Sequence, residues 1–335
     1  MKKRNLKLDA CLANGLALLM LLTGVAGLSS CSDDDGLTEG DAGYFTSTRG
    51  QFTATIDDGN GNKTTLYLIP GSTAGTALVT YDGSNPKHWQ SSTNTTVRIG
   101  TYQNDIVIPE TVEVGGTTYT IVGLDKEAFM GNREYSTTVN SVKTVYWSGL
   151  KTIQLPASVS TLGEGAFAIC TNLSTFPTLP AAVSEIPLGC FATCTDLRTV
   201  DIPATVKTVG EMAFYGDVRL QTLTFAEGVE TIGRMAFFDC RSTSLTTVTI
   251  PSTVTRIGDQ AFGGRGMIYN SSGVGTDWRT HIASFYVKAK TPPTLEGSLY
   301  GEPAEGVSPV VYVPAGCVAA YKAAPGWSSL TIEEE

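Results

Sequence analysis

Histidine, cysteine and carboxylate side chains could carry chemistry in this chain, but few of them are spaced for it. The 335 residues contain two histidines, His88 and His281, and neither lies near a Gly-x-Ser-x-Gly or His-Glu-x-x-His motif. No Cys-x-x-Cys spacing is present that would bind zinc. We therefore expect no metal, no cofactor and no catalytic centre in this protein.

One pair of carboxylates could suit a hydrolase. Glu164 and Glu211 occupy the same position two repeats apart, so a separation of about 10 Å is expected, which fits an inverting glycosidase. However, the same position holds Arg234 in the following repeat. We interpret these residues as a position that recurs with the repeat, and we expect the protein not to be an enzyme.

The seven cysteines do not predict a disulfide framework. Three of them share one repeat position, and Cys190 stands where other repeats have alanine; the three are Cys170, Cys194 and Cys240. Small apolar side chains in a buried column explain all four. A disulfide between Cys170 and Cys194 is geometrically possible. We favour reduced thiols because the same column also contains Asp217 and Arg265, which cannot form a disulfide.

These residues recur because the segment that contains them repeats. The stretch VSTLGEGAFAIC at 159–170 returns at 183–194, 206–217, 229–240 and 254–265. Its phenylalanines are 23 to 25 residues apart and are predicted to fill one column of a core: Phe167, Phe191, Phe214, Phe237 and Phe262. Tyr215, which follows Phe214, is expected nearer to the solvent.

A strand pattern precedes each of these segments, as in Leu150-x-x-Ile153-x-Leu155-Pro156. The Gly-x-x-Ala-Phe segment that follows is interpreted as a turn leading into one helical turn, with Glu164 and Asp259 favouring the start of the helix. A repeat of 20 to 29 residues with an L-x-x-L-x-L strand is typical of leucine-rich repeats. The predicted fold is a strand-rich α/β repeat solenoid.

The combined pattern L-x-x-I-x-I-P-x-x-V-x-x-I-G-x-x-A-F-x-x-C resembles the BspA-like leucine-rich-repeat family of Bacteroides surface proteins, most strongly over 105–265. This resemblance implies a right-handed superhelix, a first coil at 106–129 that contains a hairpin around Gly115-Gly116, and a closing strand and helix within 310–327. It also implies adhesion to host matrix proteins or to other bacteria. Asp125 and Pro187 depart from the pattern by replacing its glycine.

The predicted organisation has five parts. Residues 1–30 are a signal peptide and 31–43 a flexible tether. Residues 44–104 are a β-rich N-terminal cap or a small separate β-domain. The repeats follow at 105–281, with insertions at 130–149 and 263–281, and residues 282–335 are the last coil and the C-terminal strand–helix cap.

The first 31 residues predict export and lipid attachment. Four basic residues precede an apolar run at 12–28 that is about 17 residues long, which is short for a permanent membrane span. Leu28-Ser29-Ser30-Cys31 resembles the lipobox of bacterial lipoproteins, and the acidic residues after it resemble the export signal of Bacteroides lipoproteins. We expect a lipid on Cys31, an outer-membrane location and exposure at the cell surface.

A binding face is predicted on the outer side of the repeat strands, where polar positions alternate with core positions. The candidate ligand-binding residues vary between coils and are expected to form one patch: Lys151, Gln154, Arg198, Asp201 and Gln221. The loops at 130–149 and 263–281 are the alternative site. The expected partners are a host or bacterial surface protein or glycan. A carbohydrate-capturing role beside polysaccharide import is the second hypothesis.

The charge argues against nucleic acid as a partner. The whole chain has a net charge of −9, and removal of residues 1–30 takes away four basic residues and one acidic residue. The remaining chain therefore lies near −12, without the basic footprint that a nucleic-acid-binding protein needs.

Overall fold

The computed structural model describes residues 50–59, 61–81, 96–97, 102–138, 141–147, 149–269 and 275–335. The predicted signal peptide, the tether, Cys31 and His88 lie outside these residues. Within the described part of the chain, no helix is long and apolar enough to cross a membrane.

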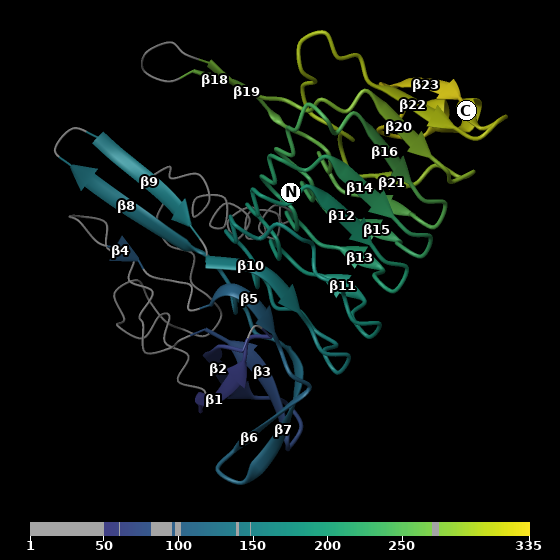
Figure 1. Ribbon diagram of the computed structural model, residues 1–335. Helices are drawn as coiled ribbons and strands as arrows, with labels where there is room; N and C mark the ends of the chain where they lie inside the picture. Colours follow the sequence, from purple (N-terminus) through teal and green to yellow (C-terminus); the bar gives the residue numbers. More distant parts are fainter. Residues whose placement is uncertain are drawn as a thin grey trace, which may run out of the picture.

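The N-terminal cap is a curved five-stranded sheet in the order β1-β2-β3-β7-β6 (Figure 1). Its strands are β1 (Phe52–Asp57), β2 (Lys63–Pro70), β3 (Thr76–Thr80), β6 (Thr111–Val114) and β7 (Thr117–Leu124). The hairpin predicted around Gly115-Gly116 is confirmed, because β6 and β7 pair there and both glycines have positive φ, +59° and +79°. This sheet thus extends beyond residue 104, into the segment predicted as the first coil.

The repeats form a solenoid of stacked coils, as predicted. Five coils contribute a short strand each to one parallel sheet, made of β11 (Glu185–Ile186), β13 (Thr208–Val209), β15 (Thr231–Ile232), β17 (Arg256–Ile257) and β21 (Thr294–Leu295). A second row follows the predicted repeat strands, except that the pattern at 173–180 forms no strand. The row begins with the pair β5 (Gln103–Val107) and β10 (Gly149–Gln154). The pair β12 (Thr199–Ile202) and β14 (Thr222–Phe225) follows. It ends with a four-stranded sheet of β16 (Thr247–Ile250), β20 (Ser284–Val287), β22 (Val310–Val313) and β23 (Thr331–Glu334).

The phenylalanine column predicted from the repeat runs through the core. Its rings are parallel to within 11°, and neighbouring centroids lie 4.9 to 5.5 Å apart; the members are Phe129, Phe167, Phe191, Phe214, Phe237 and Phe262. The spacing is close to the ~4.8 Å between neighbouring strands, so each coil adds one ring to the stack. All six side chains are at most 2% exposed.

The segment around Ala-Phe is a chain of turns, and the prediction of a helical turn there is wrong. In the coil of Phe167, Gly165 and Ile169 have φ of +60° and +62°, which excludes a helix. Alternate amide groups bond within the coil and to the next coil: Ala166 N–H donates to Gly163 O (3.1 Å), and Phe167 N–H donates to Cys190 O (2.8 Å). A helix would keep all these bonds inside one coil and leave the coils unlinked.

The acidic residues that follow the repeat glycine also have another role. Glu211 accepts a hydrogen bond from Arg234 at 2.8 Å, and Glu164 lies 3.8 Å from Lys126. They therefore form ion pairs between neighbouring coils and do not cap a helix.

The repeat glycine permits close approach between coils. A Cβ on Gly233 would lie 2.5 Å from the carbonyl carbon of Gly210 in the preceding coil. Asp125 is tolerated at the equivalent position of the first coil because its neighbour is the cap, where the Thr80 hydroxyl donates to its carboxylate at 2.9 Å. The departure from the repeat pattern at Asp125 thus marks the junction with the cap.

Tyr215 is buried, contrary to the expectation that it lies nearer to the solvent. It is 2% exposed, stacks on Phe238 with a centroid distance of 5.6 Å, and donates a hydrogen bond to Asp239 at 3.1 Å. It belongs to a second apolar cluster beside the main core, with Met130, Ala168, Ile169, Ala192, Met212 and Phe238.

Both predicted insertions contain a β-hairpin. The first holds β8 (Asn132–Thr138) and β9 (Ser141–Trp147), and β8 also pairs with β4 (Thr96–Val97). The second holds β18 (Arg265–Tyr269) and β19 (Gly275–Trp278). Each insertion leaves its coil just after the repeat phenylalanine, so both hairpins project from the same side of the solenoid (Figure 1).

The C-terminal cap contains the predicted strand β22 and helix, α2 (Val318–Ala323), followed by the further strand β23. Tyr321 and Trp327 are fully buried and pack edge to face at 5.0 Å. Their polar atoms bond to the last coil, since Tyr321 Oη donates to Ala289 O (2.7 Å) and Trp327 Nε1 donates to Pro293 O (2.8 Å). This cap therefore covers the open end of the core.

Candidate binding face

The outer side of the repeat strands is a regular polar surface. In β12, β14 and β16, exposed and buried positions alternate as period-2 patterning requires. Five of the six exposed positions in these strands are threonine: Thr199, Thr222, Thr224, Thr247 and Thr249, with Asp201 as the sixth. The parallel register places Thr199 beside Thr222 and Asp201 beside Thr224. The Thr224 hydroxyl donates to the Asp201 carboxylate.

The structure brings together three of the five candidate residues. Arg198, Asp201 and Gln221 are exposed on adjacent coils, and Gln221 N–H donates to Arg198 O at 2.8 Å. Lys151 and Gln154 are also exposed, but they belong to β10. A coil that contains Ser174 intervenes, since Ser174 N–H donates to Lys151 O at 3.1 Å. The predicted single patch is therefore two groups separated by one coil.

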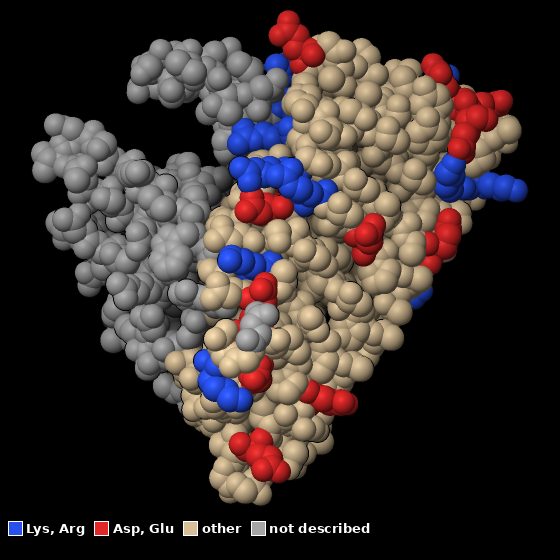
Figure 2. Space-filling model, viewed as in Figure 1, with Lys and Arg blue, Asp and Glu red and all other residues tan. Residues whose placement is uncertain are grey.

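Charges on this face are sparse and of both signs. Arg219 pairs with Asp196 in the loops that precede β14 and β12. Figure 2 shows isolated blue and red side chains on a mostly uncharged surface, without a large patch of one sign. Such a surface favours recognition by hydrogen bonds and shape over long-range attraction of a highly charged partner.

Sequence reasoning missed an aromatic pair on the same face. Tyr286 of β20 and Tyr312 of β22 are half-buried and stack with centroids 4.9 Å apart. Thr249, which stands at the repeat position of Asp201, lies beside Tyr286, and Tyr286 lies beside Tyr312. Lys288 Nζ lies 5.4 Å from the centroid of Tyr286. The sequence did contain a signal for this pair. In Phe285-x-Val287, the middle residue occupies the position that faces outward in the other repeat strands.

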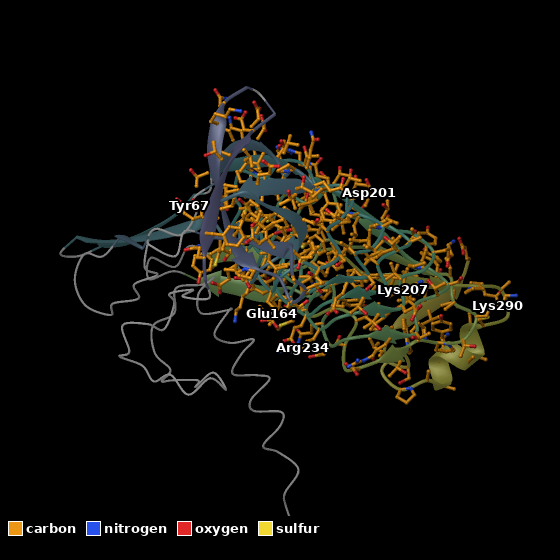
Figure 3. The ribbon with its side chains drawn as sticks, turned by 90° about the horizontal axis from the view of Figure 1, so that it is seen from below. Tyr67, Glu164, Asp201, Lys207, Arg234 and Lys290 are labelled. Carbon is orange, nitrogen blue, oxygen red and sulfur yellow. The ribbon has the colours of Figure 1, made fainter. Side chains whose placement is uncertain are left out.

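The candidate catalytic carboxylates lie elsewhere. Figure 3 shows Glu164 and Arg234 on the opposite side of the solenoid from Asp201. Glu164 pairs with Lys126 and Glu211 pairs with Arg234, so this recurring position links neighbouring coils. His281 is half-buried, and no protein atom bonds to its buried Nδ1. Among the described residues, no group of three or more histidine, cysteine or acidic side chains could hold a metal ion.

The cysteine column is buried and reduced, as favoured from the sequence. Cys170, Cys190, Cys194 and Cys240 are free thiols. Cys194 Sγ donates to Phe167 O, the carbonyl of the preceding coil, at 3.2 Å, and Cys240 Sγ donates in the same way to Phe214 O at 3.2 Å. These bonds give the column a structural role.

Asp217 interrupts this column. Its side chain is fully buried, one carboxylate oxygen accepts the Cys194 N–H at 2.8 Å, and the other has no hydrogen-bond partner. Burial raises the pKa of Asp217 well above its usual range, because desolvation disfavours the charged form. Asp217 is thus a cost to stability between the buried thiols of Cys194 and Cys240.

Comparison with known proteins agrees with this architecture. Residues 140–268 match the BspA type leucine rich repeat region in six copies. The chain carries BspA-type leucine-rich repeats. No curated protein matched the sequence.

Three solved structures are similar to this chain. A leucine rich cell surface protein from Faecalibacterium prausnitzii is 18% identical, with a TM-score of 0.41 over 78% of this chain and 70% of that one. A leucine-rich repeat protein from Bacteroides ovatus is 17% identical, with a TM-score of 0.35 over 80% and 74%. Another from Bacteroides capillosus is 22% identical, with a TM-score of 0.32 over 52% and 98%.

Proposed function

We propose that this protein is a non-enzymatic binding protein of the cell surface, which recognises a protein or glycan through the outer face of its repeat strands. The observation that carries the proposal is the set of outward-facing side chains at one repeat position, with Asp201 beside Thr224 on two coils and Thr249 beside the stacked, half-buried tyrosines on later ones. None of these exposed polar side chains fills the core. A rigid sheet with polar side chains in register is the usual recognition surface of repeat solenoids.

Cys31 supports the surface location within this proposal. Lipid on that thiol would hold the protein at the outer membrane, and the following residues would give the repeats reach beyond the membrane. The corresponding test is Cys31→Ser, which should release the protein from the detergent phase of a membrane fraction. Detergent partitioning like that of the wild type would contradict the anchor.

Carbohydrate capture is the second candidate, and the tyrosine pair favours it. Each ring offers an apolar body with a hydroxyl at its tip, which suits a ligand with both apolar and polar faces. In this case Tyr286→Ala together with Tyr312→Ala should weaken binding more than Arg198→Ala together with Asp201→Ala.

The test uses the purified chain without residues 1–30 on two panels, immobilised matrix proteins and a glycan array. Saturable binding to proteins alone supports adhesion, and saturable binding to glycans alone supports carbohydrate capture. In either case, Arg198→Ala with Asp201→Ala should lose signal while unfolding like the wild type. The tyrosine double variant is compared at equal amounts of folded protein, because its rings are half-buried and stacked. Binding to neither panel would contradict the proposed function.

A further inference from the structure

The N-terminal cap contains a pocket between the two edges of its own sheet. β1 and β6 are the outermost strands, and each pairs with only one neighbour, β2 or β7. The sheet curves until β1 and β6 contact each other, yet they form no ladder. A pocket of about 320 Å³ lies there, lined by 54–57 of β1, 111–113 of β6, and Val107 and Pro109.

We call the line along which β1 and β6 meet the seam. The direction of the hydrogen bonds of β1 shows which of its backbone groups face this seam. Asp58 N–H donates to Asn62 O at 3.0 Å, toward β2. Alternate residues of an antiparallel strand face the same way, so Ala54 and Ile56 also bond toward β2. Thr55 and Asp57 therefore turn their amide and carbonyl groups to the seam.

The same reasoning applies to β6. Ile121 N–H donates to Glu110 O at 2.9 Å, which places Glu110 and Val112 on the side of β7. Thr111 and Glu113 consequently turn their backbone groups to the seam. Among the described residues, no backbone group is bonded to these donors and acceptors on either wall, and buried Ala54, Ile56 and Val112 lie beneath them.

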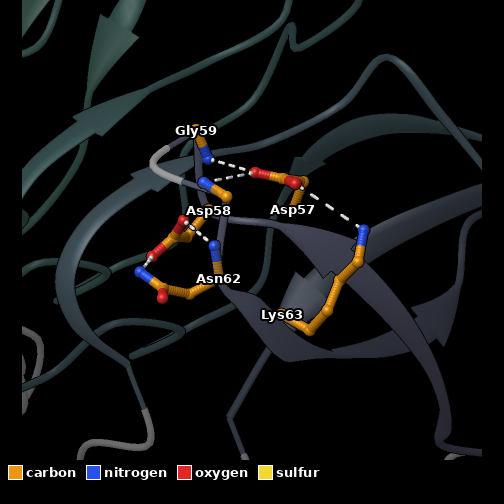
Figure 4. Close-up of polar contacts among 6 residues, drawn as sticks. Asp57, Asp58, Gly59, Asn62 and Lys63 are labelled. Atoms are coloured by element: carbon orange, nitrogen blue, oxygen red, sulfur yellow. Dashed lines mark hydrogen bonds and ion pairs between the residues drawn. The ribbon is translucent and has the colours of Figure 1, made fainter.

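The turn after β1 is held firmly at one end of the pocket (Figure 4). Asp57 accepts the N–H groups of Gly59 (2.9 Å) and Gly61 (3.2 Å), and Asp58 accepts the N–H of Asn62 at 3.1 Å. A Cβ on Gly59 would lie 2.6 Å from Val107, so the turn rests directly on the pocket wall. This wall is therefore preformed.

The rim carries more negative than positive charge. Glu110, Glu113 and Asp57 are exposed, and among the residues that the structure describes Asp57 alone of the three forms an ion pair, with Lys63 at 3.6 Å. An added strand with lysine or arginine at alternate positions would complement this rim, and its other side chains would face Ala54, Ile56 and Val112.

We propose that the seam between β1 and β6 binds an extended basic polypeptide segment of a partner protein by strand addition, for which the two contacting edges must move apart to the ~10 Å that an inserted strand requires. Main-chain bonds to a sheet edge give affinity, and alternate side chains give selectivity. The free edges are themselves an unusual feature, because proteins normally cover or block exposed edges. This site is separate from the binding face of the repeats.

The probe is a fluorescein-labelled, end-blocked nonapeptide that alternates valine with lysine, and fluorescence anisotropy gives its Kd for the chain without residues 1–30. We expect saturable binding. Replacement of every lysine by glutamate should abolish it, because the rim is acidic. N-methylation of alternate backbone amides should weaken it at least about fivefold, since each lost hydrogen bond contributes roughly that much.

Three protein variants locate the site. Glu113→Lys should weaken binding about tenfold. Thr55→Pro should weaken it about fivefold, because it removes an edge-facing amide and leaves the β2 ladder intact. Glu185→Lys makes the same charge change on exposed β11 and should leave the Kd unchanged.

Two results would overturn the proposal: no saturable binding of the lysine peptide, or binding that neither N-methylation nor Glu113→Lys weakens. Arg198→Ala with Asp201→Ala should leave peptide binding intact. Loss of ligand binding on the repeat face would therefore not be mistaken for loss of this site.

Discussion

The phenylalanine core and the outer strand face of the same coils differ in how much they vary. Inside, every coil from Phe129 to Phe262 places a phenylalanine on the previous ring at 4.9 to 5.5 Å. Outside, the position equivalent to Asp201 becomes threonine and then tyrosine in later strands. Stacking demands one side-chain shape in the column, whereas solvent accepts many. Stability and recognition can therefore change independently in this fold.

The largest expected effect comes from the inner column. Phe214→Ala should lower the free energy of unfolding by about 3–5 kcal/mol, since it leaves a cavity between two stacked rings. Urea unfolding followed by circular dichroism measures the loss. Thr247→Ala, an exposed change in β16, is the control and should cost less than about 0.5 kcal/mol. Equal losses in the two variants would contradict the division between the sides.

Tyr215 tests whether the core is confined to the phenylalanine column. Because Tyr215 is buried against Phe238 and bonded to Asp239, Tyr215→Ala should cost about 3 kcal/mol. Tyr215→Phe removes only the hydroxyl and should cost about 1 kcal/mol. A loss below 0.5 kcal/mol for the alanine variant, as for an exposed residue, would mean that the second apolar cluster adds little stability.

The repeat glycine gives an intermediate effect. Gly233→Ala should cost roughly 2 kcal/mol, because its Cβ would meet the Gly210 carbonyl carbon at 2.5 Å and the coils would have to separate. Asp125→Ala, at the equivalent position beside the cap, adds no Cβ and should cost only about 1 kcal/mol through the lost Thr80 bond. The urea midpoints of the two variants distinguish these mechanisms.

Asp217 should make stability fall as the pH rises. Its folded pKa lies above its unfolded value, so the folded state retains a proton that the unfolded state has released. This stabilising contribution is complete below the unfolded pKa and is lost as the pH rises through the folded pKa. Asp217→Cys restores the repeat column and should flatten this dependence between about pH 4 and 7. Unfolding at several pH values tests it, and an unchanged slope would contradict the assignment.

Periodic features of the fold could be predicted from the sequence because they depend on side chains that recur. The phenylalanine column and the reduced cysteines are confirmed on this basis, whereas the hairpin at Gly115-Gly116, also confirmed, was predicted from its turn dipeptide and the family resemblance. The helical turn after the repeat glycine was wrong because the bonds between coils compete with those inside a helix. Left-handed conformations at Met212 and Met235 give no sequence signal, since methionine is common in helices.

Features that depend on one coil's neighbours were harder to predict. The separation of Lys151 from Arg198 follows from counting the coil of Ser174, whereas the burial of Tyr215 depends on packing beside Phe238. The seam in the cap could not be predicted, because it requires the first and last strands of a curved sheet to meet.

The central claim is that the outer face recognises a ligand without contributing to stability. The most direct measurement compares the wild type with Arg198→Ala/Asp201→Ala on the same matrix-protein and glycan panels. The variant should lose most of the wild-type signal while its unfolding free energy stays within about 0.5 kcal/mol. An unchanged binding pattern would contradict the claim, and so would a loss of signal that merely follows a loss of folded protein.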